Sequence, residues 1–291
     1  MIKLTRTAEP PAGFAGEQRI EKNLALIRLR QDGKKPSNKV WKQAKTHLKA
    51  ESHGKCAYCE SDTSTVAYGD VEHFRPQSVY WWLAYCYDNF SYSCQLCNQM
   101  YKIATFRVAR EARRWRGPAM PAPTEEIAAQ EHARLMTPDP RDRATGGMPF
   151  DEFLRSAIKE KPFLVDPYVE DPEELYGWEA DPVLKEVRVT ARTNRIRAIR
   201  AIRAAEDDLG LNREELRRRR WQNYEVLKTL ADVIKTLPPD HATEAKEVAA
   251  AAIRAMMAPE REYAAMARYF VRVEWRLDVT TAEEQVETPV R

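Results

Sequence analysis

Four of the five cysteines in this sequence of 291 residues form two C-x-x-C pairs. Cys56 and Cys59 lie in KCAYCE, and Cys94 and Cys97 lie in SCQLCN. Two thiolates at this spacing on a tight turn can both reach one Zn²⁺, so two pairs supply a closed tetrahedral site. A closed site leaves no position for a substrate, and we therefore expect a structural zinc. The alternative is buried thiols packed as small apolar side chains, which is what we expect of Cys86 within VYWWLAYCY.

Between the two pairs lies GDVEHFRPQS, in which Asp70, Glu72 and His73 could bind a metal or move protons. An imidazole with a pKa of about 6.5 can accept a proton near neutral pH. Because side chains alternate along a strand, Glu72 and His73 can meet at one phosphate only where the strand ends or bulges. Pro76 follows closely and favours a strand end. The alternative is a polar turn in which His73 is an ordinary turn or core histidine.

The segment from Glu72 to Lys102 resembles the HNH endonucleases, which have the ββα-metal fold, in their zinc-containing branch. The family pattern is an acid followed by His, then a Pro, a middle Asn, and a final Asn or His one helical turn before a Lys. In this sequence the pattern is matched, in order, by Glu72, His73, Pro76, Asn89, Asn98 and Lys102. The usual acid of the family is Asp, so it stays open whether Glu72 or Asp70 binds the metal.

This resemblance implies a role for each matched residue. His73 would be the general base, and Glu72 with Asn98 would hold one catalytic Mg²⁺ or Mn²⁺ beside the scissile phosphate. Asn89 would orient the loop that carries His73. The phosphate contacts are expected from Arg75, Lys102, Arg107, Arg110, Arg113 and Arg114. The alternatives are an ion pair of Arg75 with Asp70 or Glu72, and a solvated helix face for the arginines of 103–116.

Phrases outside the motif, such as PFLVDPYVEDPEE and LGLNREELRRRR, extend the resemblance to the HNH proteins of the Septu and retron-linked anti-phage systems. In those systems an HNH subunit works beside an ABC-type ATPase. The resemblance therefore implies a nuclease, with DNA favoured over RNA as its substrate. It also implies an ATPase as partner. The alternative from another class is a zinc-knuckle protein that binds nucleic acid or assembles with partners but does not catalyse.

The remaining pattern predicts an α+β fold that is mainly helical. We expect an extended N-terminal arm at 1–37, the nuclease module with its zinc site at 38–116, a loop-rich connection at 117–192 and a C-terminal helical domain at 193–291. Within the module, 38–52 has the period of an amphipathic helix. The alternating stretch VLKEVRVTA predicts a β-hairpin in the connection.

Two helix starts are also predicted from their first residues. Ser93 is expected to cap the helix that begins at the second cysteine pair. Asn212, with Glu215 three residues later, is expected to form a capping box before the helix that contains RRRRW at 217–221. For that basic run three partners stay open: nucleic acid, an acidic protein, or neighbouring glutamates.

Composition and charge set the other limits. Charged residues make up 31% and aromatic residues 9% of the chain, which is typical of a folded globular protein. The net charge of +3 does not identify a partner. We find no stretch with the length of a membrane span or the pattern of a signal peptide. We therefore expect a cytoplasmic protein without membrane contact, whose reduced thiols can bind metal.

Overall fold

The computed structural model describes residues 1–63, 68–122, 126–237 and 243–279. Within these ranges the chain has an α+β fold, mainly helical, as predicted, with two short antiparallel hairpins. The α-helices are α1 (Gly16–Gln31), α2 (Asn38–Trp41), α3 (Lys45–Glu51), α4 (Glu126–Leu135), α5 (Phe150–Lys159), α6 (Ile196–Asp207), α7 (Glu214–Thr236), α8 (Thr243–Met257) and α9 (Ala264–Arg268). The strands are β1 (Asp70–His73), β2 (Phe90–Ser93), β3 (Tyr176–Asp181) and β4 (Glu186–Ala191).

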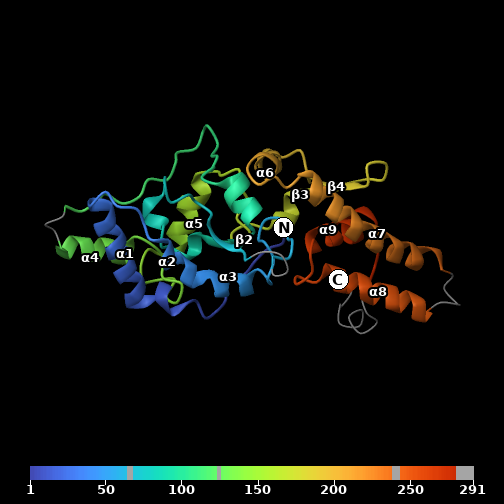
Figure 1. The fold of residues 1–291 in the computed structure, drawn as a ribbon, viewed down its shortest axis with the longest axis horizontal. Coiled ribbons are helices and arrows are strands. Elements are labelled where there is room, and N and C mark those ends of the chain that lie inside the picture. The colour runs from blue at the N-terminus through green and yellow to red at the C-terminus, as the bar shows by residue number, and fades with distance from the viewer. Residues whose placement is uncertain (64–67, 123–125, 238–242, 280–291) are drawn as a thin grey trace, which may run out of the picture.

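Shorter helical turns connect these elements. The 3-10 turns are η1 (Ala12–Phe14), η2 (Lys42–Ala44), η3 (Trp81–Leu83), η4 (Tyr87–Asn89) and η6 (Pro172–Glu174). Two segments are π-helical, η5 (Leu96–Lys102) and η7 (Tyr269–Glu274). Figure 1 shows α1 beside α4 at one end of the molecule and α7 beside α8 at the other. One continuous apolar core contains residues from Met1 to Val279 and so joins the two ends.

The predicted ββα order is present around the motif, but its helix differs from the prediction. β1 pairs with β2 in register, His73 opposite Phe90, and β1 ends at His73 as expected. The following helix η5 is a π-helix, in which the amide of Ile103 donates to the carbonyl of Asn98 at 2.7 Å. Ser93 is the last residue of β2 and does not cap this helix, so that prediction is wrong.

The amphipathic helix predicted for 38–52 is present as three consecutive segments, α2, η2 and α3. Its apolar side chains Ala44 and Leu48 are completely buried. They pack in a second, smaller apolar core against side chains of the β1–β2 hairpin such as Val71 and Phe90. This packing fixes the polar side of the segment next to β1.

The N-terminal region is not the extended arm that the sequence predicted, because residues 16–31 form α1. α1 is held against α4 by polar side chains. Arg19 donates to the carbonyl of Thr137 at 2.9 Å, and Asn23 donates to that of Ala133 at 2.9 Å. The connecting region at 117–192 likewise contains α4, α5 and the β3–β4 hairpin. The hairpin was predicted, whereas the two helices were not.

The C-terminal helices pack around the β3–β4 hairpin. β4 contacts both α6 and α7. Asn212, predicted to cap α7, instead forms a pair of hydrogen bonds with β4: its Oδ1 accepts from the amide of Val189 and its Nδ2 donates to the carbonyl, each at 2.9 Å. The predicted capping box is therefore wrong. Side-chain bonding to an edge strand has replaced the local cap.

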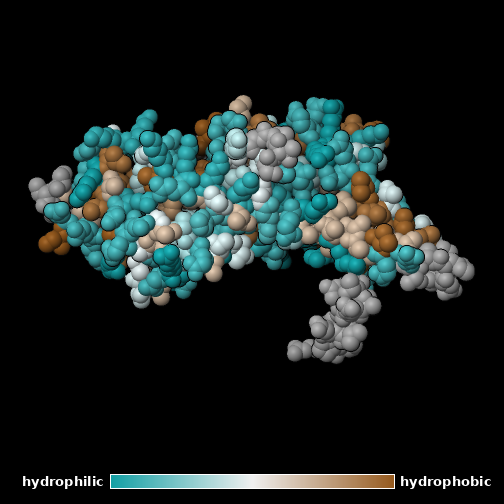
Figure 2. Space-filling view, turned by 60° about the horizontal axis from the view of Figure 1, so that its bottom comes forward, coloured by the Kyte–Doolittle hydropathy of each residue, from teal (hydrophilic) through white to brown (hydrophobic). Residues whose placement is uncertain are grey.

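The surface facing the viewer in Figure 2 is mostly hydrophilic, with apolar side chains gathered at the end that carries α7 and α8. Val226 of α7 and Val248 of α8 are both exposed. Across the described ranges, none of the helices combines the length and the apolar character needed to cross a membrane.

Candidate metal centre and active site

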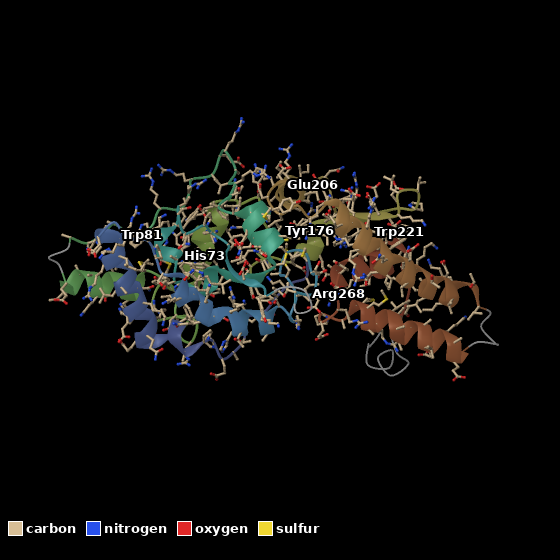
Figure 3. The ribbon with its side chains drawn as sticks, in the orientation of Figure 1. His73, Trp81, Tyr176, Glu206, Trp221 and Arg268 are labelled. Carbon is tan, nitrogen blue, oxygen red and sulfur yellow. The ribbon has the colours of Figure 1, made fainter. Side chains whose placement is uncertain are left out.

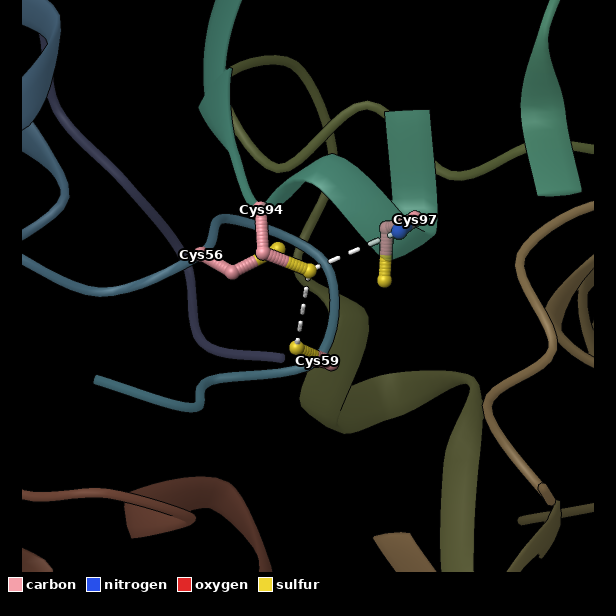
Figure 4. A group of neighbouring side chains, drawn as sticks. All are labelled: Cys56, Cys59, Cys94 and Cys97. Carbon is pink, nitrogen blue, oxygen red and sulfur yellow. Dashed lines mark hydrogen bonds between the residues drawn. The ribbon is translucent and has the colours of Figure 1, made fainter. Parts of the chain in front are cut away.

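The two cysteine pairs come together in one cluster, with all four sulfurs within 4.8 Å of one another. The sulfurs of Cys59 and Cys94 are 3.9 Å apart, and the amide of Cys97 donates to the sulfur of Cys94 at 3.4 Å (Figure 4). In a tetrahedral zinc-thiolate site with bonds of about 2.3 Å, neighbouring sulfurs lie about 3.8 Å apart. The donor set and its spacing therefore fit Zn²⁺, as predicted. Three of the cysteines are buried and Cys94 is half-buried. Four thiolates would fill the coordination of a tetrahedral zinc and leave no position for a substrate.

The fifth cysteine lies outside this cluster. Cys86 is buried in the main apolar core, where the sequence placed it. Burial raises the pKa of its thiol to about 12, so it stays protonated and acts as an apolar side chain.

Segments from the C-terminal part of the chain surround the cysteine cluster. The guanidinium of Arg213 lies 3.8 Å from the sulfur of Cys97. Burial would lower the pKa of Arg213, but the cysteine sulfurs beside it more than offset this and raise it. Lys55, next to the first pair, donates to the carbonyl of Arg261 at 2.7 Å, and Ser61 hydrogen-bonds Tyr263 at 3.0 Å. A four-thiolate zinc site carries a net charge of −2, which the adjacent guanidinium partly neutralises.

A cavity of about 450 Å³ is lined by the β1 strand, the α2–α3 segment and η5. Asp70, Glu72 and His73 of β1 line this cavity together with Asn98 of η5. Figure 3 shows His73 in the half of the molecule that contains α1 to α5, well apart from Trp221 and Arg268. The structure thus brings four of the predicted site residues to one cavity.

His73 is held in one tautomer and is largely buried, with 8% of its surface exposed. Its Nε2 lies 3.0 Å from the carbonyl oxygen of Ala84. Since a carbonyl can only accept, Nε2 carries the proton and Nδ1 carries the lone pair. The ring packs edge-on against Trp41 and Phe90, with centroids at 4.8 and 5.0 Å. Burial lowers the pKa of His73 to about 4, so the imidazole is neutral at pH 7.

Glu72 is 2% exposed and forms an ion pair with Lys102. Burial raises the pKa of Glu72, although the nearby Lys102 opposes this shift. Lys102 also donates to the backbone carbonyl of His73 at 2.8 Å and has no exposed surface. The expectation that Lys102 reaches a phosphate therefore does not fit its position. Its role in this structure is to fix Glu72 and the end of β1.

Asn89 lies behind the loop that follows His73 and is also buried. Its Oδ1 accepts from the amide of Arg75 at 2.9 Å, and its Nδ2 donates to the carbonyls of Arg75 and Leu83 at 3.0 and 3.3 Å. These three bonds fix the backbone directly after His73. The orienting role predicted for Asn89 stays a prediction.

Arg75 is only 2% exposed. This burial does not fit the phosphate contact that the sequence predicted for it. Its ion pair is with Glu160 at 2.8 Å, rather than with Asp70 or Glu72. Tyr80 donates to the same carboxylate at 2.6 Å. Both interpretations offered by the sequence are therefore wrong for Arg75, because its partner comes from the end of α5.

Asp70 and Asn98 are less buried than Glu72. Asp70 accepts a hydrogen bond from Gln99 at 2.7 Å, and the amide of Asn98 donates to the carbonyl of Cys94 at 3.0 Å. Their side-chain oxygens are of the type that Mg²⁺ and Mn²⁺ prefer. Because Asp70 and Glu72 line the same cavity, the choice between them as metal ligand stays open.

The arginines after η5 do not line the described part of the cavity. Arg107 pairs with Asp207 at 3.1 Å and with Asp208 at 3.0 Å, so it joins this segment to α6. Arg114 donates to the carbonyl of Phe106 at 3.4 Å. Arg110 and Arg113 are exposed. The segment 103–116 is irregular rather than helical, and as a group these arginines do not form the predicted phosphate-binding patch beside His73.

The basic run at 217–221 is also used within the chain. Arg217 pairs with Glu186 at 2.7 Å, Arg218 with Glu214 at 2.7 Å, and Arg219 with Glu262 at 3.3 Å. The fourth arginine, Arg220, is completely buried and donates to the carbonyl of Leu211 at 2.6 Å. Pairing with glutamates was one of the predicted alternatives, although two of the three partners lie far away in the sequence.

Two lysines that sequence analysis passed over do line the cavity. Lys42 and Lys45 lie on the polar side of the η2–α3 segment, opposite β1. Their signal in the sequence is a lysine at every third or fourth position of NKVWKQAKTHLK, which places them on one helix face.

No family model matches this sequence, and no solved structure matches it. The chain is 31% identical to the Septu protein PtuB of Bacillus mycoides (strain KBAB4). That alignment spans 141 residues and covers 40% of this chain and 46% of the relative. The chain thus spans about half the length of the curated relative that it matches.

Proposed function

We propose that this protein is a metal-dependent endonuclease of the HNH type, which hydrolyses phosphodiester bonds in nucleic acid. We favour DNA over RNA as its substrate. The observation that carries the proposal is the meeting of Glu72, His73 and Asn98 in one cavity, with His73 fixed as a neutral base. A protein that only binds nucleic acid has no need of a fixed base beside two oxygen ligands.

In the proposed reaction the lone pair of His73 Nδ1 accepts the proton of the attacking water. The hydrogen bond from Nε2 to Ala84 keeps the ring in this tautomer, and the packing of Trp41 and Phe90 keeps it in place. Asn89 fixes the backbone behind the base.

The same cavity offers the donors for a catalytic Mg²⁺ or Mn²⁺. Glu72 and Asn98 would hold the ion, with Asp70 as the alternative acid, and the ion would stabilise the charge that develops on the phosphate and the leaving oxygen. Lys102 forms an ion pair with Glu72 and neutralises the charge of its carboxylate. Metal binding therefore competes with this ion pair or adds to it through the second carboxylate oxygen.

We place the activity in an anti-phage defence system of the cytoplasm, where the protein works beside an ABC-type ATPase. The similarity to a Septu protein supports this class of system. The ATPase follows from the wider likeness of the sequence to the HNH proteins of such systems.

The first test compares wild type, His73→Ala and His132→Ala on plasmid DNA and total cellular RNA, with and without Mg²⁺. Mg²⁺ is omitted rather than chelated, because a chelator would also remove zinc from the cysteines. His132 is the matched control, since it lies on α4 away from the cavity. We expect cleavage by wild type and His132→Ala, and a loss of about 100-fold or more in His73→Ala.

Equal cleavage by His73→Ala would show that His73 is not the base. If none of the three proteins cleaves, the assay is repeated with the ATPase partner present, and failure there too would reject the nuclease.

A second candidate function is a zinc-knuckle subunit that binds nucleic acid without cutting it. The ion pair between Glu72 and Lys102 favours it, because a ligand that is already neutralised binds a divalent cation less strongly. Titration of wild type and Glu72→Gln with Mn²⁺ separates the two functions. An enzyme binds the ion and loses it in Glu72→Gln or, where Asp70 is the ligand, in Asp70→Asn, whereas the silent subunit binds none.

A further inference from the structure

The most exposed aromatic side chain of the described residues is Tyr68, which lies next to residues that line the His73 cavity. Tyr68 is 93% exposed and comes two positions before Asp70, which lines the cavity. A tyrosine this exposed contributes almost no apolar burial to the fold. The ammonium of Lys45 lies 5.8 Å from the centre of its ring. The ring is therefore presented to solvent beside a cation that also faces the cavity.

The two lysines of the same wall have the charge and the freedom to hold a phosphate. Lys42 is exposed and Lys45 is half-buried, and neither forms an ion pair with a described residue. The arginines nearest this region differ: Arg75 is paired with Glu160, and Arg107 with the two aspartates at the end of α6. Lysines on a flexible stem suit the point-like contact with a nucleic-acid backbone.

The reactive groups lie below the surface. Glu72 is 2% and His73 is 8% exposed, so a scissile phosphate must enter the cavity to reach them. The cavity of about 450 Å³ has the size of a small-ligand pocket. A base-paired duplex presents its phosphates on a stiff cylinder with a major groove about 12 Å wide. A single strand can bend into the cavity and turn its bases outward.

Part of the cavity lining is apolar. Ile103, directly after η5, lines the cavity and is 66% exposed. Its backbone has a positive φ of 49°, which is rare for a β-branched residue. Such strained positions concentrate at functional sites, where the surrounding structure maintains them. The cavity therefore combines two lysines, one of them beside an exposed aromatic ring, with an exposed apolar side chain.

We propose that the cavity receives an unpaired nucleic-acid strand, whose phosphates contact Lys42 and Lys45 while a base stacks on Tyr68. This inference rests on the endonuclease proposed above and names the form of its substrate. Stacking on an exposed aromatic ring next to cations is how single strands are held without sequence preference.

The test measures binding of labelled oligonucleotides of about 12 nucleotides, within the range of known single-strand site sizes. The probes are a DNA strand, the RNA strand of the same sequence, and the blunt DNA duplex, each titrated by fluorescence anisotropy. His73→Ala prevents cleavage, and wild type without Mg²⁺ serves as a second form in case that variant does not fold. We expect the strand to bind about tenfold tighter than the duplex.

Three variants locate the contacts. Tyr68→Ala should weaken binding of the strand about 10-fold, whereas Tyr68→Phe, which keeps the ring, should not. The double variant Lys42→Gln, Lys45→Gln should lower the slope of log K against log salt by about 1.4, since each phosphate contact contributes about 0.7 for a single strand. Leu184→Ala and Lys185→Gln are the controls. Both residues are exposed in the turn between β3 and β4, and neither should change binding.

The outcomes distinguish the two proposals. If the duplex binds as tightly as the strand, or if Tyr68→Ala binds like Tyr68→Phe, the unpaired-strand inference is wrong and the endonuclease proposal stands. If neither strand nor duplex binds, and wild type fails to cleave both alone and with the ATPase partner, both are wrong. Comparison of the DNA and RNA strands tells which nucleic acid supplies the substrate.

Discussion

Two groups of polar side chains lie around the β1–β2 hairpin and η5 and differ in how they are held. At the cysteine cluster all four sulfurs lie within 4.8 Å of one another, and together they would fill the coordination of one zinc. At the His73 cavity the reactive side chains do not contact one another in this way. Lys102 holds Glu72 through an ion pair, and the carbonyl of Ala84 holds His73 through a hydrogen bond. A structural metal site is closed and a catalytic site keeps an open position. One small module contains both arrangements.

The largest effect should come from opening the closed site. We expect Cys97→Ser to lose its zinc and to lower the Tm by about 10 °C or more, because structural zinc contributes directly to folding free energy. The measurement is the zinc content of the purified protein together with thermal unfolding.

Cys86→Ala is the control for this variant, because Cys86 is equally buried but lies outside the cluster. It should keep one zinc per chain. If Cys97→Ser also keeps its zinc and its Tm, the cysteine cluster is not a structural zinc site.

The next largest effect concerns the support of the open site. Arg75→Met leaves the buried carboxylate of Glu160 without its cation and should cost about 3–5 kcal/mol of the free energy of unfolding. Urea unfolding measures this cost.

The double variant Arg75→Met, Glu160→Gln has no unpaired charge and should regain part of the lost stability. A single variant as stable as wild type would show that the loop after His73 does not depend on this pair.

A smaller effect should appear with pH. The pKa of His73 is about 4 in the folded chain and about 6.5 in an unfolded one. Between these values the unfolded chain binds more protons, so stability is lost as pH falls from 6.5 towards 4 and is fully present above this range. We expect wild type without added Mg²⁺ to lose about 2 kcal/mol more than His73→Asn between pH 7 and pH 5. An equal loss in both proteins, measured by urea unfolding, would mean that His73 is not buried as a neutral base.

The smallest effect is expected away from both regions. Arg218 forms an exposed ion pair with Glu214 one helical turn earlier. Arg218→Gln should therefore leave the free energy of unfolding within about 0.5 kcal/mol of wild type. If Arg218→Gln lost as much free energy of unfolding as Arg75→Met, burial would not decide how much an ion pair of this protein contributes to stability.

The sequence predicted what depends on local spacing. The cysteine pairs, the acid and histidine of β1, and the strand end at His73 all follow from residues close together in the chain or from a motif of fixed order. The hairpin at β3 and β4 was found from its alternating pattern for the same reason.

Partners that are distant in the chain could not be predicted in this way. Glu160 lies 85 residues after Arg75, and Asp208 lies 101 residues after Arg107. Both arginines resemble surface residues until the fold brings a carboxylate to them. The burial of Lys102 could not be predicted either, because it depends on how η5 packs against β1.

α1 was missed for a different reason. Its buried face includes Arg19, Asn23, Leu26 and Ile27, which have the helical period, but two of these side chains are polar. A search for apolar periodicity does not detect such a face. The polar residues are buried there because they bond the carbonyls around α4, which the sequence alone does not reveal.

The contacts around the cysteine cluster have one more consequence. Arg213 at the start of α7 touches Cys97, and residues just before α9 bond the knuckle at Lys55 and Ser61. Cys97 belongs to the same short helix as Asn98, so Arg213 contacts the residue directly before one that lines the cavity. A chain shortened before Arg213 would lose this contact together with the bonds to Lys55 and Ser61.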